Sequence, residues 1–360
     1  MDTTCQTQSM SVAELYLQAC QETGATPIRA VLHNLGATTS LNLNYYFMGP
    51  LRAKALAIAL KNDKIITNLE LSHNTLKAKG TAYLMKALSS NTSVRSLDKY
   101  KFEELDLSLN KFKGGEHLGQ LLARNGGIKV LNLSGNCFSK NSAVALMSSL
   151  KENSTLKQLQ LSFCVLGRSE AQSLGQALSE NSTLVLLDLS YNWIDDKAVR
   201  LLCQGLTTNN TLGVLKLSHN PITSIGALAL LEAVKNNRNS ALEKIDISSV
   251  FVDETFMELL EETLQTHPAL DVQYSVMSSV TRNLSALQIF KNFFEEQSET
   301  IMDFFQALDE EKTMTVSTSA FRAAVKEANI PLDRRQLEWL INKFDKEFTA
   351  KIAYSQFAKL

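Results

Sequence analysis

The sequence predicts an α/β solenoid, a horseshoe with a parallel sheet inside and helices outside, followed by a small all-α domain. Three observations predict it. A strand pattern returns every 26 to 36 residues, amphipathic segments separate its copies, and the composition changes after about residue 275. We expect an N-terminal helical cap over residues 1–36, about eight repeats over 37–275 and the all-α domain over 276–360.

The recurring strand pattern is L-x-x-L-x-L-x-x-N, which is typical of leucine-rich repeats. Its copies are Ile66–Asn74, Phe102–Asn110, Ile128–Asn136, Leu156–Cys164, Leu184–Asn192 and Leu212–Asn220, with less complete ones at Leu41–Tyr46, Leu242–Val250 and Leu270–Val272. Alternate residues of a strand face opposite sides, so both leucines of L-x-L point inward and stack on those of the next repeat. The closing Asn is expected to satisfy backbone groups of the turn, and Cys164 replaces it once.

The segments between the strands predict helices, because small residues and a Leu/Ala stripe recur at helical spacing. Examples are Gly80–Leu88 and Gly226–Val234. Several helices are expected to end at an asparagine, which tolerates the left-handed conformation that stops a helix. These asparagines are Asn91, Asn153, Asn181 and Asn210.

One repeat is longer than the others by about eight residues, located around residues 98–105. Val94–Asp98 and Phe102–Asp106 resemble two tandem copies of the same strand start. The insertion is interpreted either as a bulged loop or as a segment that contacts a partner, because insertions in solenoids lie in loops on one face.

After residue 275 a second internal period of 36 residues indicates a pair of EF-hands. Phe305–Asp309 matches Ile341–Asp345, and we expect the two loops to pair through Val316 and Ile352. A working calcium loop needs a glycine at its sixth position and a bidentate glutamate at its twelfth. The first loop has Asp309 and Glu311 but Met314 and Ala320 at those positions; the second has Asp345 and Glu347 but Ala350 and Gln356. The sequence therefore predicts vestigial loops that bind no metal.

Composition excludes several classes of function. With 36 Lys and Arg against 37 Asp and Glu, the chain has no basic excess for a nucleic-acid partner. No apolar stretch approaches the roughly 18 residues of a membrane helix, and the N-terminus does not read as a signal peptide. The five cysteines are scattered, which indicates free thiols and a cytoplasmic protein. They are Cys5, Cys20, Cys137, Cys164 and Cys203.

No catalytic residue, cofactor or metal ligand is expected. The five histidines have no metal-ligand spacing and are interpreted as surface turn residues, with His73 and His219 at the same repeat position. They are His33, His73, His117, His219 and His267. The chain also lacks the phosphate-binding, hydrolase and kinase motifs, and Cys203 lies in a helix stripe rather than at a nucleophile site.

The candidate binding residues lie on the open face of the predicted sheet and at its edge. The outward residues within L-x-L are Asn42, Glu70, Asp106, Asn132, Gln160, Asp188, Lys216 and Asp246. A serine follows at nearly every next outward position and is expected to leave room for a partner. Phe163, Tyr191 and Trp193 then come from adjacent turns. They are interpreted either as interface anchors, a role in which Trp and Tyr are enriched, or as turn packing.

The chain resembles the ribonuclease-inhibitor type of leucine-rich repeat and, more closely, the leucine-rich repeat-containing protein 74 subfamily. The closer resemblance rests on Tyr16–Cys20, Leu41–Asn44, Gly115–Gly119, Asn220–Ile222, Ile245–Ser248, His267–Val272 and the degenerate C-terminal loops. It implies an intracellular protein with no established catalytic activity. The chain lacks the cysteine richness of ribonuclease inhibitors and the strongly acidic tail of Ran GTPase-activating proteins, which share this repeat type.

These observations lead to one functional hypothesis and two alternatives. The chain is expected to be a monomeric, non-catalytic scaffold that binds an unidentified protein through the inside of the horseshoe. Regulation of a small GTPase is the first alternative, because that activity requires a protein surface but no pocket. A calcium-responsive adaptor acting through the C-terminal domain is the second.

Overall fold

The computed structural model describes residues 10–90, 102–111, 116–276, 278–297, 300–309, 312–345 and 349–357. The chain divides into two compact units, Met1–Ser275 and Val276–Leu360. Each unit has its own hydrophobic core. None of the described helices is both long and apolar enough to cross a membrane.

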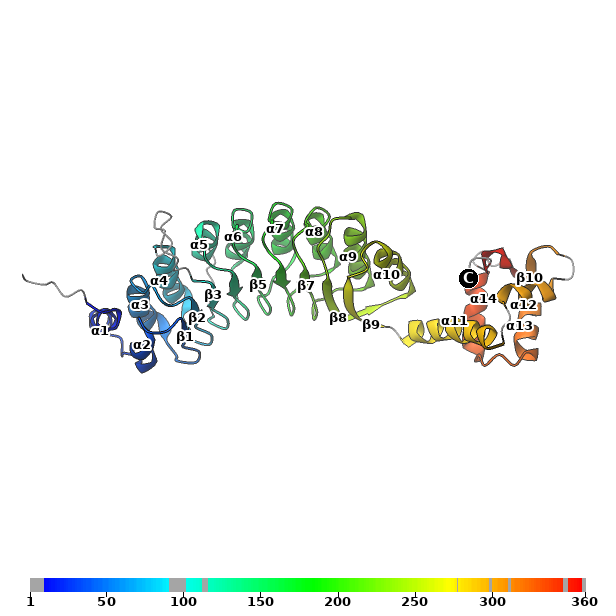
Figure 1. Cartoon of the computed structure of the whole chain (residues 1–360), viewed down its shortest axis with the longest axis horizontal. Coiled ribbons are helices and arrows are strands. Elements are labelled where there is room, and N and C mark those ends of the chain that lie inside the picture. The colour runs from blue at the N-terminus through cyan, green and yellow to red at the C-terminus, as the bar shows by residue number, and fades with distance from the viewer. Residues whose placement is uncertain are drawn as a thin grey trace, which may run out of the picture. The chain divides into compact units, whose positions relative to one another are not determined.

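The first unit is a leucine-rich-repeat solenoid in which strands and helices alternate and form two layers (Figure 1). Its sheet has nine strands in sequence order: β1 (Ser40–Asn42), β2 (Asn68–Glu70), β3 (Glu104–Asp106), β4 (Val130–Asn132), β5 (Gln158–Gln160), β6 (Leu186–Asp188), β7 (Val214–Lys216), β8 (Lys244–Val252) and β9 (Asp271–Val276). Pairing from β1 to β8 is parallel throughout.

Eight helices form the second layer: α3 (Gly49–Leu60), α4 (Lys77–Ser90), α5 (Glu116–Arg124), α6 (Lys140–Ser149), α7 (Arg168–Leu178), α8 (Asp196–Leu206), α9 (Ser224–Asn236) and α10 (Glu254–Thr266). Two further helices precede the first strand, α1 (Val12–Thr23) and α2 (Arg29–Asn34). The Tyr16 hydroxyl of α1 is buried and accepts a hydrogen bond from the Ile28 amide at 3.1 Å, which ties these two helices together.

The strand register confirms the predicted stacking of leucines. The second leucine of each repeat pairs with its equivalent in the next, from Leu41 and Leu69 to Leu215 and Ile245. All eight residues in this column are at most 2% exposed. The repeat unit is therefore held by one hydrophobic core, shared between repeats, that no single repeat could bury alone.

An asparagine column runs beside the leucines, as the sequence predicted. The Asn192 amide group donates to the Leu161, Leu189 and Ser190 carbonyls at 2.9 to 3.1 Å. Its Oδ1 accepts from the Cys164 and Leu166 amides at 3.0 Å. Asn74, Asn110, Asn136 and Asn220 make equivalent bonds. Cys164 interrupts the column, and its thiol donates to the Leu133 carbonyl at 3.4 Å.

A second column of asparagines closes the turns from helix to strand. Asn209 donates to the Leu178 and Asn181 carbonyls and accepts from the amides of Thr211 and Leu212, at 2.8 to 3.0 Å. Asn210, which was expected in this role, is exposed. That prediction was wrong because the first of the two adjacent asparagines, and not the second, closes the turn.

His267 is buried rather than a surface turn residue, and this prediction was also wrong. It occupies the end of the second asparagine column, where its Nε2 lies 3.0 Å from the Asn237 carbonyl and its Nδ1 lies 2.9 Å from the Thr266 hydroxyl. The imidazole, like the amide of an asparagine, has two polar atoms that can close the last turn. His33 is exposed on α2, and nothing is described of the His117 side chain.

Helices α7 and α8 pack against each other through glycine. A Cβ on Gly205 would lie 2.1 Å from the Gly175 carbonyl oxygen, and a Cβ on Gly175 would lie 2.3 Å from the Leu201 carbonyl oxygen. Only glycine permits this approach, so the spacing of the helix layer depends on these two residues.

The long repeat keeps the common register. Its strand β3 is formed by the copy that begins at Phe102, and Leu105 pairs with Leu69 and Leu131. The other copy, Val94–Asp98, lies outside the described residues, and so does most of the insertion. The register shows that the extra residues leave the sheet unbroken.

The second unit contains α11 (Ser278–Gln297), α12 (Ile301–Leu308), β10 (Thr315–Ser317), α13 (Thr318–Glu327), α14 (Arg334–Phe344), β11 (Lys351–Ala353) and the short 3₁₀ helix η1 (Tyr354–Phe357). Strands β10 and β11 are antiparallel, and Val316 pairs with Ile352 as expected. The core is aromatic: Phe290, Phe305, Phe321 and Phe344 contact one another.

Candidate partner-binding surface

The register brings the predicted outward residues of the sheet into one column. Glu70 pairs with Asp106, Gln160 with Asp188, and Lys216 with both Asp188 and Asp246. Asn42 and Asn132 complete this set of eight residues, which we call the sheet column. All eight are partly or fully accessible, so the open face of the sheet presents them as a line across the repeats.

Several side chains of the sheet column form hydrogen bonds with the backbone of the following turn. Asp106, Asp188 and Asp246 each accept a hydrogen bond from the amide of the serine two residues later, at 2.8 to 3.0 Å. This local bond explains why Asp and Asn recur at the position, since short side chains with an oxygen stabilise such turns. Asp188 also lies 3.9 Å from the Lys216 ammonium. The sheet column therefore supports the turns as well as facing solvent.

The serines that follow do not form the open row that the sequence suggested. Ser72, Ser108, Ser190 and Ser218 are buried. The Ser108 hydroxyl donates to that of Ser72 at 2.9 Å, and the Ser218 hydroxyl lies 3.3 Å from that of Ser190. Parallel pairing holds these serines within hydrogen-bond reach, so the row is closed at these two pairs, whereas Ser134 and Ser162 between them are half-buried. Only Ser248, at the end of the array, is exposed.

In the first seven repeats, the residue two positions after the second leucine of L-x-L forms what we call the inner rim column: Tyr45, His73, Leu109, Gly135, Phe163, Tyr191 and His219. All seven have a positive φ, between 55° and 68°. In the first six, the amide donates to the serine carbonyl of the next repeat at 2.8 to 3.2 Å, which continues the sheet ladder through the turn. The left-handed conformation follows from this turn and directs the side chains to the edge of the sheet.

Neighbouring rings of the inner rim column stack. Tyr191 lies between Phe163 and His219, with centroid separations of 4.2 and 4.1 Å and interplanar angles of 13° and 9°. Tyr45 and His73 form a separate pair at 4.2 Å. Phe163 and Tyr191 remain 56% and 43% exposed, so the rings contact one another along the column while their edges face solvent.

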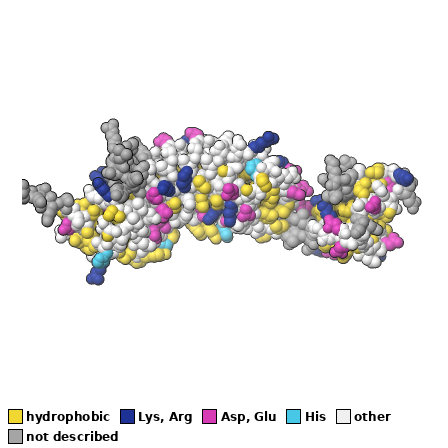
Figure 2. All heavy atoms as spheres, viewed as in Figure 1, with side chains coloured by type: hydrophobic (Ala, Val, Ile, Leu, Met, Phe, Trp, Pro, Cys, Tyr) yellow, Lys and Arg dark blue, Asp and Glu magenta, His cyan; other side chains and the backbone are white. Residues whose placement is uncertain are grey.

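A second, outer rim column comes from the residue four positions after the second Leu or Ile of L-x-L in the repeats of β4 to β8. It consists of Cys137, Val165, Trp193, Pro221 and Phe251, from five consecutive repeats, and all five are exposed. Trp193 is 68% exposed, and its ring makes no aromatic contact within the described residues. Figure 2 shows hydrophobic side chains along this edge of the repeat unit. The two rim columns contain no Lys, Arg, Asp or Glu.

The structure places the three predicted anchors in different columns. Phe163 and Tyr191 belong to the inner rim column, whereas Trp193 belongs to the outer one. Sequence reasoning missed the third ring, His219, and the outer residues Val165 and Phe251 as parts of the same surface. The signal that could have found them is position alone, two or four residues after the second Leu or Ile of L-x-L.

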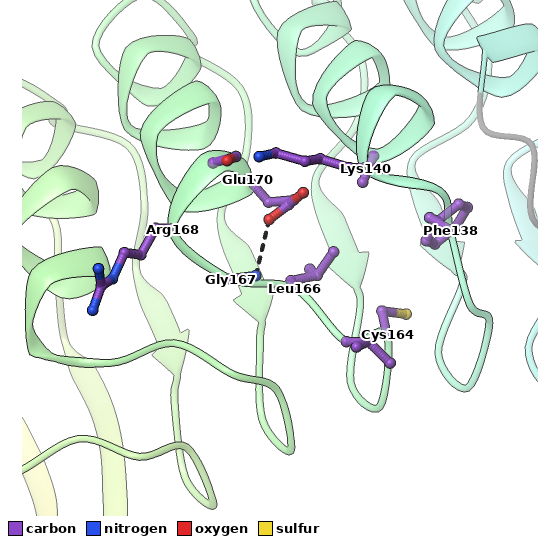
Figure 3. Close-up of a pocket in the computed structure, with 10 residues that line it drawn as sticks. Phe138, Lys140, Cys164, Leu166, Gly167, Arg168 and Glu170 are labelled. Atoms are coloured by element: carbon purple, nitrogen blue, oxygen red, sulfur yellow. Dashed lines mark hydrogen bonds between the residues drawn. The ribbon is translucent and has the colours of Figure 1, made fainter.

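A hollow of about 520 Å³ lies beside the rim, between the turns that follow β4 and β5 (Figure 3). Phe138, Val165 and Leu166 line it together with charged residues of the neighbouring helix starts. Glu170 is buried and accepts from the Gly167 amide at 3.0 Å. Glu170 thus stabilises the start of α7.

Arg168, at the mouth of this hollow, is held by Asp195. Its Nε donates to both carboxylate oxygens of Asp195, at 2.8 and 3.1 Å. The Arg168 side chain, and then the Ala198 amide, lower the pKa of Asp195 to about 2. Asp195 is also the N-cap of α8, so this exposed pair links two adjacent helix starts.

The thiols of Cys164 and Cys203 are buried in the repeat unit. Burial raises the pKa of Cys164 and of Cys203 to about 12, which keeps both thiols protonated at neutral pH. Cys203 donates to the Ala229 carbonyl at 3.4 Å. Cys20, Cys137, Cys164 and Cys203 are all free thiols, as expected.

The loops of the second unit use their first aspartates to bind protein groups. Asp309 accepts from the Thr313 amide and hydroxyl, the Met314 amide and the Tyr354 hydroxyl, at 2.7 to 3.1 Å. Asp345 accepts the equivalent bonds from Thr349 and Ala350. Burial raises the pKa of each aspartate, but these bonds together outweigh it and lower the pKa.

Glu311 and Glu347, the other acidic residues of these loops, lie outside the described residues. Among the described residues no group of three or more His, Cys, Asp or Glu side chains is placed to hold a metal ion. Met314 and Ala350 take the position of the loop glycine with φ of 58° and 61°, which is strained for residues with a side chain.

Comparison with known proteins identifies the repeats. Residues 180–203 and 208–231 match the family described as Leucine Rich repeat. The chain is similar to actin-binding site 2 of leiomodin-1, with 21% identity and a TM-score of 0.33 over 37% of this chain and 75% of that one. It is also similar to the tropomodulin C-terminal domain of Caenorhabditis elegans, with 16% identity and a TM-score of 0.32 over 36% and 77%. Two segments of the chain thus match this family, and the stacked leucine and asparagine columns show a leucine-rich-repeat fold.

Proposed function

We propose that the chain is a non-catalytic cytoplasmic scaffold that binds another protein through the two rim columns and the adjoining sheet column. Phe163, Tyr191 and Trp193 are the anchors of this surface. Glu70, Asp106, Gln160, Asp188, Lys216 and Asp246 flank them with polar and charged groups. The resemblance to the leucine-rich repeat-containing protein 74 subfamily agrees with this proposal.

The observation that carries the proposal is the placement of bulky exposed rings at strained backbone positions. A residue with a side chain costs about 1–2 kcal/mol in the left-handed conformation, whereas glycine takes it without strain. Gly135 shows that this turn accepts glycine. Phe163, Tyr191 and His219 instead combine this strain with exposed ring edges, although stacking compensates for part of it. Strain retained at exposed positions is typical of binding sites.

The rim contains enough apolar side chains for specific binding. Anchors of this kind are worth about 2 kcal/mol or more each when they are covered by a partner. Three of them supply much of the roughly 8 kcal/mol of a micromolar complex. The sheet column adds charges that orient a partner more than they raise its affinity.

The test is quantitative affinity capture from cells with a rim variant. Trp193→Ala, Tyr191→Ala and Asp188→Ala are combined, and the fold is checked by circular dichroism. Tyr83→Ala, which removes a 37% exposed ring from helix α4, is the matched control. We expect the rim variant to lose the specific partners and the control to keep them. Retention of the same partners by a folded rim variant would refute the proposed site.

Calcium response is the less favoured alternative, because Asp309 and Asp345 are already occupied by donors from their own loops. Isothermal calorimetry of the whole chain with millimolar calcium is expected to show no binding heat. GTPase regulation has no structural observation in its favour beyond the presence of a protein-binding surface.

A further inference from the structure

We propose that the N-terminal end of the repeat unit binds the surface of an anionic lipid bilayer. The contact is made by the exposed rings of the turn after β1 and by the cations of the turns after β1, β2 and β3. This surface is separate from the protein-binding anchors Phe163, Tyr191 and Trp193, which lie in later repeats. The inference therefore adds a second kind of partner and does not depend on the proposed function.

The segment from the end of β1 to the start of α3 exposes four large apolar side chains. Tyr45, Tyr46, Phe47 and Leu51 are 63%, 41%, 77% and 58% exposed. Phe47 has the most exposed large hydrophobic side chain among the described residues. A group of exposed apolar side chains of this kind marks a contact with a protein or with a membrane.

The neighbouring repeat fixes the backbone of this turn. The Asn74 Oδ1 accepts from the Met48 amide at 3.1 Å, and the Met48 side chain is buried. The Tyr45 ring stacks on His73. Tyr45 and Phe47 have φ of 64° and 49°, a left-handed conformation that glycine would take without strain. The fold therefore holds both rings in exposed positions at the expense of backbone strain.

The turns that leave the strands lie along one edge of the repeat unit (Figure 1). We compared the ten residues that begin at the second Leu or Ile of each L-x-L. After β1 to β3 these stretches contain five Lys or Arg and one Asp or Glu: Arg52, Lys77, Lys79, Lys111, Lys113 and Glu116. After β4 to β8 they contain three Lys or Arg and five Asp or Glu, the acidic residues being Glu170, Asp195, Asp196, Asp253 and Glu254. The charge of the edge thus changes sign along the array, and its positive part coincides with the exposed rings.

The cations at the positive part of the edge are accessible. Lys77, Lys79 and Lys111 are exposed, and Arg52 is half-buried. None of these four takes part in an ion pair within the described ranges of the chain. The strand register places Leu51 and Lys79 at equivalent positions of adjacent repeats. Apolar and cationic side chains therefore lie next to one another on this edge.

Three carboxylates of the same repeats lie on the strands and not in these turns. Glu70 and Glu104 accept from side-chain amides of neighbouring asparagines, and Asp106 accepts from the Ser108 amide, at 2.7 to 2.8 Å. Residues 40–90, which form the first two repeats, contain seven Lys or Arg and two Asp or Glu. The net charge of this end therefore remains positive.

An anionic bilayer accommodates both features. Phenylalanine and leucine enter the boundary between headgroups and acyl chains, while tyrosine and lysine remain at the level of the headgroups. Each Lys or Arg near an anionic surface strengthens binding about fivefold. A bilayer also requires no pocket shaped for the projecting Phe47 ring, whereas a folded protein would have to provide one. These features favour a lipid surface over an acidic protein.

The test is co-sedimentation of the whole chain with vesicles of phosphatidylcholine, with and without about 30% phosphatidylserine, at about 0.1 M salt. We expect saturable binding to the vesicles that contain phosphatidylserine. Binding should be about tenfold weaker or worse without that lipid, and also at about 0.5 M salt, because salt screens the attraction to the headgroups.

Two pairs of variants test the residues. Phe47→Gly should weaken vesicle binding about tenfold. Its matched control is Phe163→Gly, which removes an exposed, left-handed ring from a later repeat and should change binding by no more than about twofold. Glycine suits the backbone at both positions, so both variants should fold, and circular dichroism checks this.

The second pair changes charge. Lys77→Gln combined with Lys79→Gln should weaken binding about tenfold or more. Lys61→Gln combined with Lys64→Gln removes two exposed lysines near the other end of α3, about 18 Å away, and should change binding by no more than about threefold.

A glutamate-rich peptide of about 15 residues, followed by fluorescence anisotropy, represents the competing partner. If this peptide binds through Lys77 and Lys79 while the vesicles do not bind, the partner is an acidic protein segment and the bilayer is wrong. The inference is also overturned if vesicles with and without phosphatidylserine bind equally, or if Phe163→Gly weakens binding as much as Phe47→Gly. Capture of protein partners through Trp193 tests the proposed function separately, and none of these results bears on it.

Discussion

Two columns of side chains lie one residue apart in each repeat and differ in almost every physical respect. The asparagine column is buried, and Asn192 satisfies five backbone groups. The inner rim column, which includes the preceding residue Tyr191, is strained and largely exposed. Their comparison indicates that one turn performs two tasks. The asparagine holds neighbouring repeats together, and the rim residue is available to another molecule.

The comparison predicts that adjacent substitutions will have different consequences. Asn192→Ala should lower the free energy of unfolding by about 3 kcal/mol or more, because it leaves several buried backbone groups without partners. Urea denaturation measures the change. The exposed Asn210→Ala is the control and should change stability by less than about 0.5 kcal/mol. If Asn192→Ala lowers the free energy of unfolding by less than about 1 kcal/mol, the proposed structural role of the asparagine column is wrong.

A second prediction concerns the close packing of helices α7 and α8 in the helix layer. Gly205→Ala should destabilise the protein by about 2 kcal/mol, because the new Cβ would meet the Gly175 carbonyl and force α7 and α8 apart. Gly213→Ala, whose Cβ would meet nothing closer than 3.6 Å, should be nearly neutral. Thermal unfolding compares the two variants. If the two variants shift Tm equally, the distance between α7 and α8 does not depend on glycine at position 205.

The gap in the asparagine column offers a stabilising change. Cys164→Asn should raise the free energy of unfolding by about 1 kcal/mol, because an amide restores a strong donor to the Leu133 carbonyl in place of a weak thiol contact. Cys203→Asn, at a buried helix position outside the column, should instead destabilise. If both substitutions change stability in the same direction, the column is not continuous through residue 164.

The periodic parts of this fold could be predicted from the sequence because they depend on local alternation. The leucine register, the asparagine column and the Val316–Ile352 pair follow from spacing alone. The conformation of the turns could not be predicted in the same way. The sequence alone does not show that Tyr191 has a left-handed backbone conformation and stacks between two rings. Nor does it show that the Asp188 carboxylate accepts a hydrogen bond from the Ser190 amide.

The predictions that were wrong also concern turns, whose conformation the sequence pattern does not specify. Serines that alternate outward look open in a sequence, but parallel pairing brings Ser72 and Ser108 within hydrogen-bond distance of each other. His267 resembles any polar turn residue until its ring is seen to close the last turn of the array. Tyr191 and Trp193 are both turn residues that the repeat pattern does not bury, but the structure places them in different columns.

The most direct test of the two-column account is Tyr191→Gly, measured for both stability and binding. Glycine relieves the left-handed strain but removes two stacking contacts, so the free energy of unfolding should change by no more than about 1 kcal/mol. Capture of the specific partners should be lost. A folded variant that is several kcal/mol less stable and still captures those partners would show that the rim rings serve the fold and not recognition.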